Sequence, residues 1–200
     1  MNNESKILNT RAIAKAAVLG AVAFVLMLLE FPLPIAPSFY KMDFSEAAVL
    51  MGGFALGPAY AVIIEALKVA LNLIFQGTIT MGVGEMANFL IGISFTVPAA
   101  YMYSRNKTLK TAIKGMAVGT LCMMAAGVLL NYFVLLPAYV ALAHFPMEAI
   151  IGAGQAIFPF IQNKFTFVMA CVTPFNLIKG ILISVVTRLL YKRLSPILHA

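Results

Sequence analysis

The sequence predicts an all-α integral membrane protein whose residues 1–200 form a single transmembrane domain. Hydrophobic residues make up 62% of the chain and charged residues only 10%, and the mean hydropathy is +0.96. A soluble domain carries roughly one-quarter charged residues, so the composition excludes that class. The apolar residues also fall into long runs, and a run of about 20 residues is what a membrane-spanning helix needs.

Helix-breaking sequences divide the first half of the chain into three predicted transmembrane helices. The first covers about 11–29 and ends at EFPLP, because proline cannot continue a helix. The second is short and covers about 45–57, with Ser45 as its expected N-cap and Glu46 in its first turn. Only Gly-Pro separates it from the third, about 59–75. Between the first two helices lies the proline-rich loop 30–44.

The second half of the chain predicts three longer transmembrane helices. They cover about 83–103, 112–137 and 165–191. The basic sequence YSRNKTLKTAIKG joins the fourth helix to the fifth, and the long loop 138–164 joins the fifth to the sixth. The polar N-terminal segment is followed by no small-residue cleavage site, so we expect no cleaved signal peptide.

The basic residues predict which ends of the six helices face the cytoplasm. Ten of the fourteen lie near the termini or in the loop after the fourth helix: Lys6, Arg11, Lys15, Arg105, Lys107, Lys110, Lys114, Arg188, Lys192 and Arg193. Six helices bring these regions to one side, and the positive-inside rule makes that side, with both termini, cytoplasmic. The membrane topology therefore accounts for the net charge of +7, and no nucleic-acid partner is needed to explain it.

The acidic residues show the opposite distribution. Of the seven, only Glu4 lies in a clearly cytoplasmic region, and five lie at or near the predicted external side: Glu30, Asp43, Glu46, Glu85 and Glu148. The external half is therefore where we expect the polar chemistry. His144 and Glu148 are four residues apart, but without further ligands this pair predicts no metal site.

The sequence CVTPFNLIKG places polar residues inside the sixth helix. A central lysine facing lipid costs about 2.5–3.5 kcal/mol. Asn176 and Lys179 are three residues apart and share one helix face, and Pro174 is expected to kink the helix. Two interpretations of Lys179 are open: it snorkels or pairs with an internal carboxylate, or it faces a ligand cavity.

Other polar residues inside the helices have similar alternatives. Asn131 in the fifth helix is either an interhelical hydrogen-bonding residue or part of a site. Gly82 and Gly84, before Asn88, would let a flat ligand lie against the backbone of the fourth helix. Glu65 and Lys68 in the third helix are expected to pair with each other inside the membrane.

Small residues form a stripe on the first helix. Ala12, Ala16 and Gly20 recur every four residues, and Ala17 and Ala21 begin a second stripe. Such stripes let helix backbones approach closely. The neighbour would be either another helix of this chain or a partner subunit.

The motifs that are absent narrow the function. The chain has no G-x-x-x-x-G-K-[ST] sequence and so carries no P-loop ATPase of its own. GISF matches the minimal G-x-S of intramembrane proteases, but both histidines lie outside the predicted helices, so we expect no enzyme and no catalytic residues. A stand-alone secondary carrier remains an alternative, although no internal repeat supports it. The best interpretation is a membrane subunit that binds a polar, planar solute and takes its energy from elsewhere.

Four sequence blocks together resemble one known family. FPLPIAPSFYKMDFSEAAVLMGGFALGP, ANFLIG, LNYFVLLPAY and PFNLIKG, in this order, are similar to the riboflavin-specific substrate-binding subunit (S component) of energy-coupling factor (ECF) vitamin transporters. The resemblance runs from the first helix to the C-terminus. S components for another vitamin, such as thiamine, pantothenate or a folate, are the alternative within the same fold.

The resemblance implies a fold, a location and partners. The fold would be the six-helix S-component fold with both termini cytoplasmic, in a multi-pass protein of the bacterial cell membrane. Riboflavin would be the transported ligand, with no cofactor, bound near the extracellular face under the lid loop 30–44. The alanine stripe of the first helix would dock onto a transmembrane coupling protein served by two ABC-type ATPases, and the subunit would topple in the membrane.

The resemblance also implies which residues contact the vitamin. Asn131, Asn176 and Lys179 would bind the ribityl hydroxyls or the edge of the ring. Asn88 and the backbone of Met81, Gly82 and Gly84 would meet the isoalloxazine. The lid residues are Phe39, Tyr40, Lys41 and Met42, and Asp43 would bind the ligand or cap the second helix.

Overall fold

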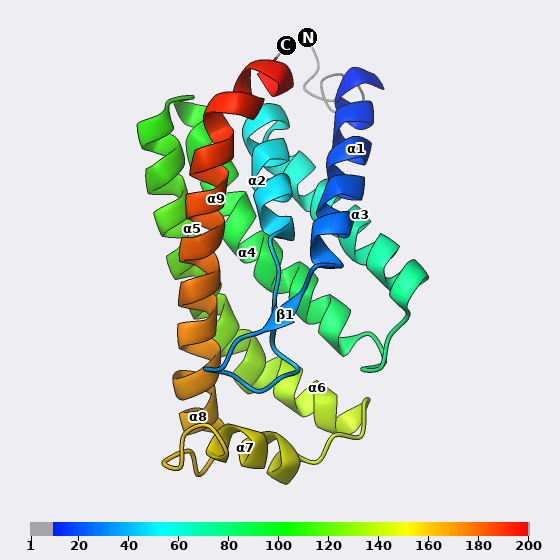
Figure 1. The fold of residues 1–200 in the computed structure, drawn as a ribbon, viewed down its shortest axis with the longest axis vertical. Coiled ribbons are helices and arrows are strands. Elements are labelled where there is room, and N and C mark those ends of the chain that lie inside the picture. The colour runs from blue at the N-terminus through cyan, green and yellow to red at the C-terminus, as the bar shows by residue number, and fades with distance from the viewer. Residues whose placement is uncertain (1–9, 200) are drawn as a thin grey trace.

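Long apolar segments fold into helices that run side by side, as the computed structural model of the protein shows (Figure 1). The structure describes residues 10–199, with the side chains of residues 10–191. Glu4 and Lys6, which entered the topology prediction, lie outside the described residues, as do the side chains of Lys192 and Arg193.

The elements follow the predicted order. Their bounds are α1 Thr10–Met27, β1 Phe31–Pro32, β2 Lys41–Met42, α2 Ser45–Leu56, α3 Pro58–Gln76, α4 Val83–Arg105, α5 Leu109–Leu130, η2 Asn131–Leu135, α6 Leu136–Ala141, α7 Met147–Gln155, α8 Lys164–Phe167, η3 Val168–Val172 and α9 Thr173–His199. The two η elements are single π-helical turns inside long helices: α5, η2 and α6 form one helix, and α8, η3 and α9 form another.

Five of these helices are long and apolar enough to cross a membrane: Thr10–Met27, Pro58–Gln76, Val83–Arg105, Leu109–Ala141 and Lys164–Tyr191. The remaining predicted span, the second at about 45–57, corresponds to α2, which has only 12 residues. At 1.5 Å per residue it reaches about 18 Å, well short of a hydrocarbon core of about 30 Å. It occupies only the upper half of the bundle in Figure 1, so its N-terminus begins at mid-height.

The expected N-cap of α2 is also different in the structure. Ser45 is the first helical residue, and the capping position is taken by Phe44, whose side chain makes no capping bond. Asp43 performs part of that role instead, because its Oδ1 accepts the backbone N–H of Ser45 at 2.8 Å. This matches one of the two functions predicted for Asp43.

Each π-helical turn is followed closely by a proline. The N–H of Leu136 bonds to the carbonyl of Asn131, just before Pro137, and the N–H of Thr173 bonds to that of Val168, just before Pro174. Proline lacks an N–H and crowds the preceding turn, so a wider turn there avoids a break. The predicted distortion at Pro174 is therefore a π-helical turn.

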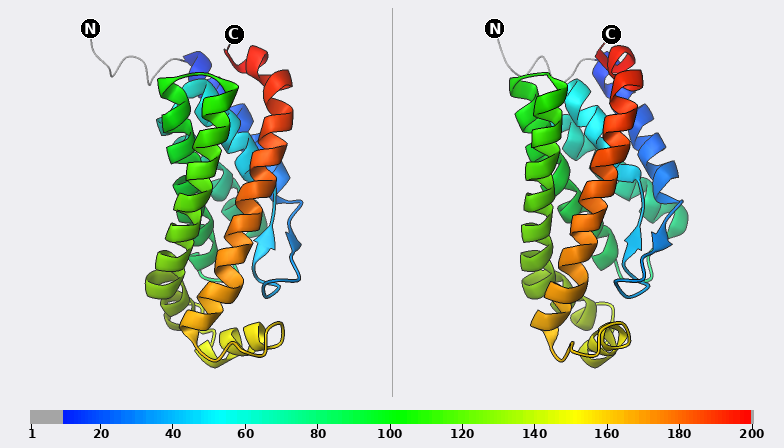
Figure 2. Two further views of the ribbon diagram at one scale, coloured as in Figure 1. Left: turned by 90° about the vertical axis from the view of Figure 1, so that its left-hand side faces the viewer. Right: turned by 60° about the vertical axis from the view of Figure 1, so that its left-hand side comes forward.

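The two predicted long loops contain structure that the sequence analysis did not identify. Within 138–164 lies the helix α7, which Pro146 precedes and which has Glu148 in its first turn. Both are ordinary signals of a helix start. Within 30–44, β1 and β2 pair antiparallel, with Phe31 opposite Met42. Figure 2 shows this hairpin on the side of the bundle and α7 across its lower end.

Candidate functional site

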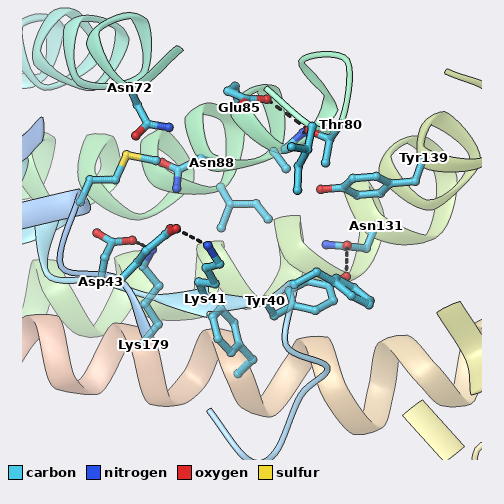
Figure 3. Close-up of a pocket in the computed structure, with 18 of the residues that line it drawn as sticks. Tyr40, Lys41, Asp43, Asn72, Thr80, Glu85, Asn88, Asn131, Tyr139 and Lys179 are labelled. Atoms are coloured by element: carbon cyan, nitrogen blue, oxygen red, sulfur yellow. Dashed lines mark hydrogen bonds and ion pairs between the residues drawn. The ribbon is translucent and has the colours of Figure 1, made fainter. Parts of the chain in front are cut away.

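A cavity of about 470 Å³ lies where the 30–44 loop meets the helices. One wall comes from α3 and α4, and the opposite wall from the loop and from the helices that contain η2 and α9 (Figure 3). This volume falls in the range of about 300–1,000 Å³ typical of sites for small organic ligands.

Nine of the twelve residues that the sequence analysis assigned to substrate binding line this cavity: Phe39, Tyr40, Lys41, Asp43, Gly84, Asn88, Asn131, Asn176 and Lys179. The other three lie elsewhere. Met42 is fully buried in the core, and Met81 is 73% exposed. Gly82 caps α4 with a φ of 85°, so its role is this left-handed conformation, which favours glycine.

Tyr40 from the loop closes one end of the cavity against η2. Its hydroxyl donates a hydrogen bond of 2.8 Å to Asn131 Oδ1 (Figure 3). Asn131 Nδ2 in turn donates to the carbonyl of Gly127 at 2.8 Å. The Tyr40 ring also lies against Phe175, with the centroids 5.7 Å apart. Burial raises the pKa of the Tyr40 hydroxyl well above its ordinary value, so it stays a neutral donor.

Lys179 lies at the other end of the cavity, between two carboxylates. Its Nζ is 3.1 Å from Asp43 Oδ2 and 3.1 Å from Glu46 Oε1. The lysine therefore pairs with internal carboxylates, one of the two interpretations of its place in the sixth helix, and it also lines the cavity. Both features hold because α2 begins at mid-height, which brings Asp43 and Glu46 beside α9.

Two asparagine side chains that line the cavity have buried polar atoms without a hydrogen-bond partner among the described residues. They are Oδ1 of Asn88, on α4, and Nδ2 of Asn176, on α9. A buried polar group left unpaired costs about 1–3 kcal/mol. Neither atom is accessible from the cavity, and Nδ2 of Asn176 packs against α5, where a Cβ on Gly127 would lie 2.3 Å from it.

The α3–α4 end of the cavity carries a hydroxyl and carboxylate cluster. Thr78 and Thr80 donate to Glu85 Oε2 at 3.0 and 3.3 Å. Thr80 Oγ1 also accepts the backbone N–H of Gly84 at 3.0 Å. At the cavity rim, Lys41 forms an ion pair with Glu30, and both side chains are partly exposed.

Several lining residues were not predicted: Met27, Glu30, Glu46, Asn72, Gln76, Gly77, Ile79, Thr80, Glu85, Ala87, Ile91, Tyr139, Phe145, Ile150 and Phe175. Asn72 could have been found, because it follows Lys68 by one turn on α3. Glu46 was missed because it was placed near the external end of the second helix, away from Lys179.

The small-residue stripe of α1 packs mainly inside the protein. Ala16 and Gly20 are buried, and a Cβ on Gly20 would lie 2.4 Å from Leu67 Cδ2 of α3. Packing against a helix of the same chain therefore accounts for these two residues, which corrects their assignment to a partner surface. Ala12 is half-buried, whereas Ala17 and Ala21 of the second stripe are exposed.

Comparisons with known proteins agree on one family. The family described as "ECF transporter, substrate-specific component" matches residues 11–191. The chain is 34% identical to the riboflavin transporter FmnP of Bacillus subtilis over 190 residues, 94% of each protein. It is 36% identical to the riboflavin transporter RibU of Staphylococcus aureus over 184 residues, 91% of this chain and 89% of that protein.

A solved structure shares the fold. It is reported under the words "Structure and mechanism of the S component of a bacterial ECF transporter". The TM-score is 0.73 at 34% sequence identity, and the match covers 95% of this chain and 98% of the other.

Proposed function

The chain belongs to the family of ECF transporter substrate-specific components, multi-pass proteins of the cell membrane, and we propose that it is the subunit that binds riboflavin for uptake. The cavity carries this proposal, because the polar side chains of Asn88, Asn131 and Lys179 line it among apolar and aromatic walls. The relatives at 34% and 36% identity, which are named riboflavin transporters, support the choice of vitamin.

The lining suits a flat ring with a polyhydroxyl chain. Tyr40, Tyr139 and Phe175 provide aromatic surface for an isoalloxazine, and Asn88 with the backbone near Gly84 faces it from α4. The ribityl hydroxyls or the ring edge would bond to Asn131, Asn176 and Lys179. A hydroxyl both donates and accepts, so a ribityl hydroxyl can bond to Lys179 or Asp43 from the cavity side while these two residues remain paired.

We further propose that the cavity opens toward the outside of the cell. The basic residues of the α4–α5 turn, the start of α1 and the end of α9 lie at one end of the bundle (Figure 1), and the cavity lies in the other half. The positive-inside rule makes the basic end cytoplasmic. α2 together with the 30–44 loop would then complete a sixth crossing and return both termini to the cytoplasm.

Membership of the family also suggests how transport is powered. An S component works with a membrane-embedded coupling protein, which we propose is driven by two ABC-type ATPases. The exposed stripe at Ala17 and Ala21 is the surface of α1 that remains free for docking after Ala16 and Gly20 are buried. Toppling of the subunit would carry the loaded cavity inward.

The proposal is tested by titrating the detergent-purified protein with riboflavin. We expect saturable quenching of flavin fluorescence with one site per chain, and a yellow protein if the vitamin copurifies. Absence of binding, together with binding of another vitamin, would overturn the choice of riboflavin and leave the family assignment intact.

Matched variants test the cavity itself. Asn176→Ala should weaken riboflavin binding, whereas Asn106→Ala, at the exposed end of α4, should not. Equal affinities for the two variants would place the ligand elsewhere.

A further inference from the structure

Five ionisable side chains form a continuous row inside the bundle, which we call the charge ladder: Asp43, Lys179, Glu46, Lys68 and Glu65. Lys179 bridges the first two carboxylates at 3.1 Å each. Lys68 Nζ lies 3.4 Å from Glu46 Oε1 and 2.6 Å from Glu65 Oε1. The signs alternate, so each lysine lies between two carboxylates.

The ladder runs from the cavity into the closed interior. Asp43, Glu46 and Lys179 line the cavity, whereas Lys68 and Glu65 do not, and both of these are 0% exposed. Glu65 ends the row at the α3–α4 contact, where a Cβ on Gly92 would lie 2.3 Å from its Oε1.

The ladder contains one more acid than base. With every group ionised, three carboxylates and two ammonium groups leave a net charge of −1. The elements around Glu65 do not balance it, because the buried residues of α1 and α4 include no charged side chain and α2 contributes only Glu46. An uncompensated charge in a dry interior is strongly unfavourable, and the group usually becomes neutral instead.

The hydrogen bonds distinguish the three carboxylates. Asp43 accepts from Ser45 and Lys179, and Glu46 accepts from Ser45 and Lys68. Glu65 contacts one cation, Lys68, at 2.6 Å, and shares it with Glu46, which also has Lys179 at 3.1 Å. No side-chain hydroxyl or backbone N–H among the described residues donates to either oxygen of Glu65. Neighbouring cations and hydrogen bonds both favour the ionised form, and Glu65 has only a half share of one lysine in a site that water does not reach, so it is the acid that is least stabilised as an anion.

We propose that Glu65 is a proton-binding site, and that its bound proton makes the charge ladder electroneutral. The proton comes from water and forms an O–H bond on the carboxyl group, and no other bond breaks. The remaining charges, two carboxylates and two ammonium groups, then cancel.

The ladder would also link this proton to the ligand, a consequence that rests on the proposed function. A neutral ligand that displaces water from the cavity lowers the local dielectric constant and makes a charge imbalance more costly. Ligand binding therefore favours the protonated form, and protein that has lost the proton takes one up when it binds.

Infrared spectroscopy of the purified full chain without ligand tests the proton site directly, because only a protonated carboxyl group shows a carboxylic-acid carbonyl stretch. At neutral pH we expect a band that is lost in Glu65→Gln and kept in Glu148→Gln, a variant of an exposed acid on α7. The band should also disappear from the unmodified protein at high pH.

The same infrared band in Glu65→Gln, or no such band in the unmodified protein, would overturn the proposal. A Glu65→Gln protein that fails to fold would also contradict it, because the amide preserves the shape and charge of the protonated acid.

Riboflavin titrations across pH test the linkage. Above the pH at which the band disappears, affinity should fall toward about tenfold per pH unit, the limit for one linked proton, and stay level in Glu65→Gln. A level profile in the unmodified protein would remove the linkage but keep the proton site. Absence of riboflavin binding at every pH would instead contradict the proposed function, while the infrared result would still stand.

Discussion

Two lysine–carboxylate pairs beside the same cavity differ in their surroundings. Lys41 and Glu30 pair at the rim, where 48% and 25% of their side-chain surfaces are exposed. Lys179 and Asp43 pair at the inner end, with 8% and 2% exposed. The chemistry of the two pairs is the same, but water solvates one and is largely excluded from the other.

This difference changes what each pair contributes. An exposed ion pair typically stabilises a protein by about 0–1 kcal/mol, because water already solvates both ions. Removing one partner of a buried pair costs about 3–5 kcal/mol, because the other charge is left uncompensated. The rim pair is therefore suited to separate when a ligand enters, whereas the charge ladder must stay assembled.

The largest expected effect is that of Lys68→Met in the charge ladder. Glu46 and Glu65 are both buried, and this change removes the cation that they share. We expect a loss of stability of about 3–5 kcal/mol, measured as a lower thermal unfolding temperature in detergent. The matched control is Lys41→Met at the rim, and equal losses in the two variants would refute the contrast.

Lys179→Met should come next, because this residue belongs to both the ladder and the cavity. We expect weaker riboflavin binding, with a stability loss that adding Asp43→Asn partly reverses, since the second change removes the stranded charge. Calorimetric unfolding of the single and double variants measures this coupling. A double variant less stable than Lys179→Met would show that the two residues act independently.

The sequence predicted contacts between neighbours on one helix better than contacts across the fold. Glu65 and Lys68 were expected to pair because residues three apart share a helix face, and they do. The contact of Lys179 with Asp43 joins residues 136 positions apart. It depends on where the short helix α2 begins, at mid-height beside α9, and the sequence predicted the length of this helix but not its position.

The cavity residues show a similar contrast between residues inside helices, which line the cavity as predicted, and some loop residues, which do not. Asn131 and Asn176 were found because a polar side chain in an apolar helix is costly and needs a partner. Met42 and Met81 were assigned to the site by the family resemblance, Met42 as a lid residue and Met81 through its backbone. Only the β1–β2 pairing and the turn before α4 decide which way such loop side chains point.

A smaller effect is expected for Tyr40→Phe, a variant that changes the cavity wall and leaves the charge ladder unchanged. It removes the hydrogen bond to Asn131 but keeps the ring against Phe175. We expect a loss of about 0.5–1.5 kcal/mol in stability or in riboflavin binding, roughly 2–13-fold in affinity. Fluorescence titration measures it, and a loss as large as that of Lys179→Met would mean that the ring itself had moved.

The smallest effect is expected for Lys41→Met at the rim. Its pair with Glu30 ties the loop strand β2 to the end of α1 in partial contact with water, so unfolding stability should change by about 0–1 kcal/mol. If the pair holds the loop over the cavity, the variant should release bound riboflavin faster at nearly unchanged stability, as stopped-flow fluorescence would show. Added salt should speed release from the unmodified protein in the same direction, because it screens the exposed pair. A release rate that responds to neither change would mean that the loop is held by the buried end of its sequence, at Asp43 and the ladder, and not by its rim.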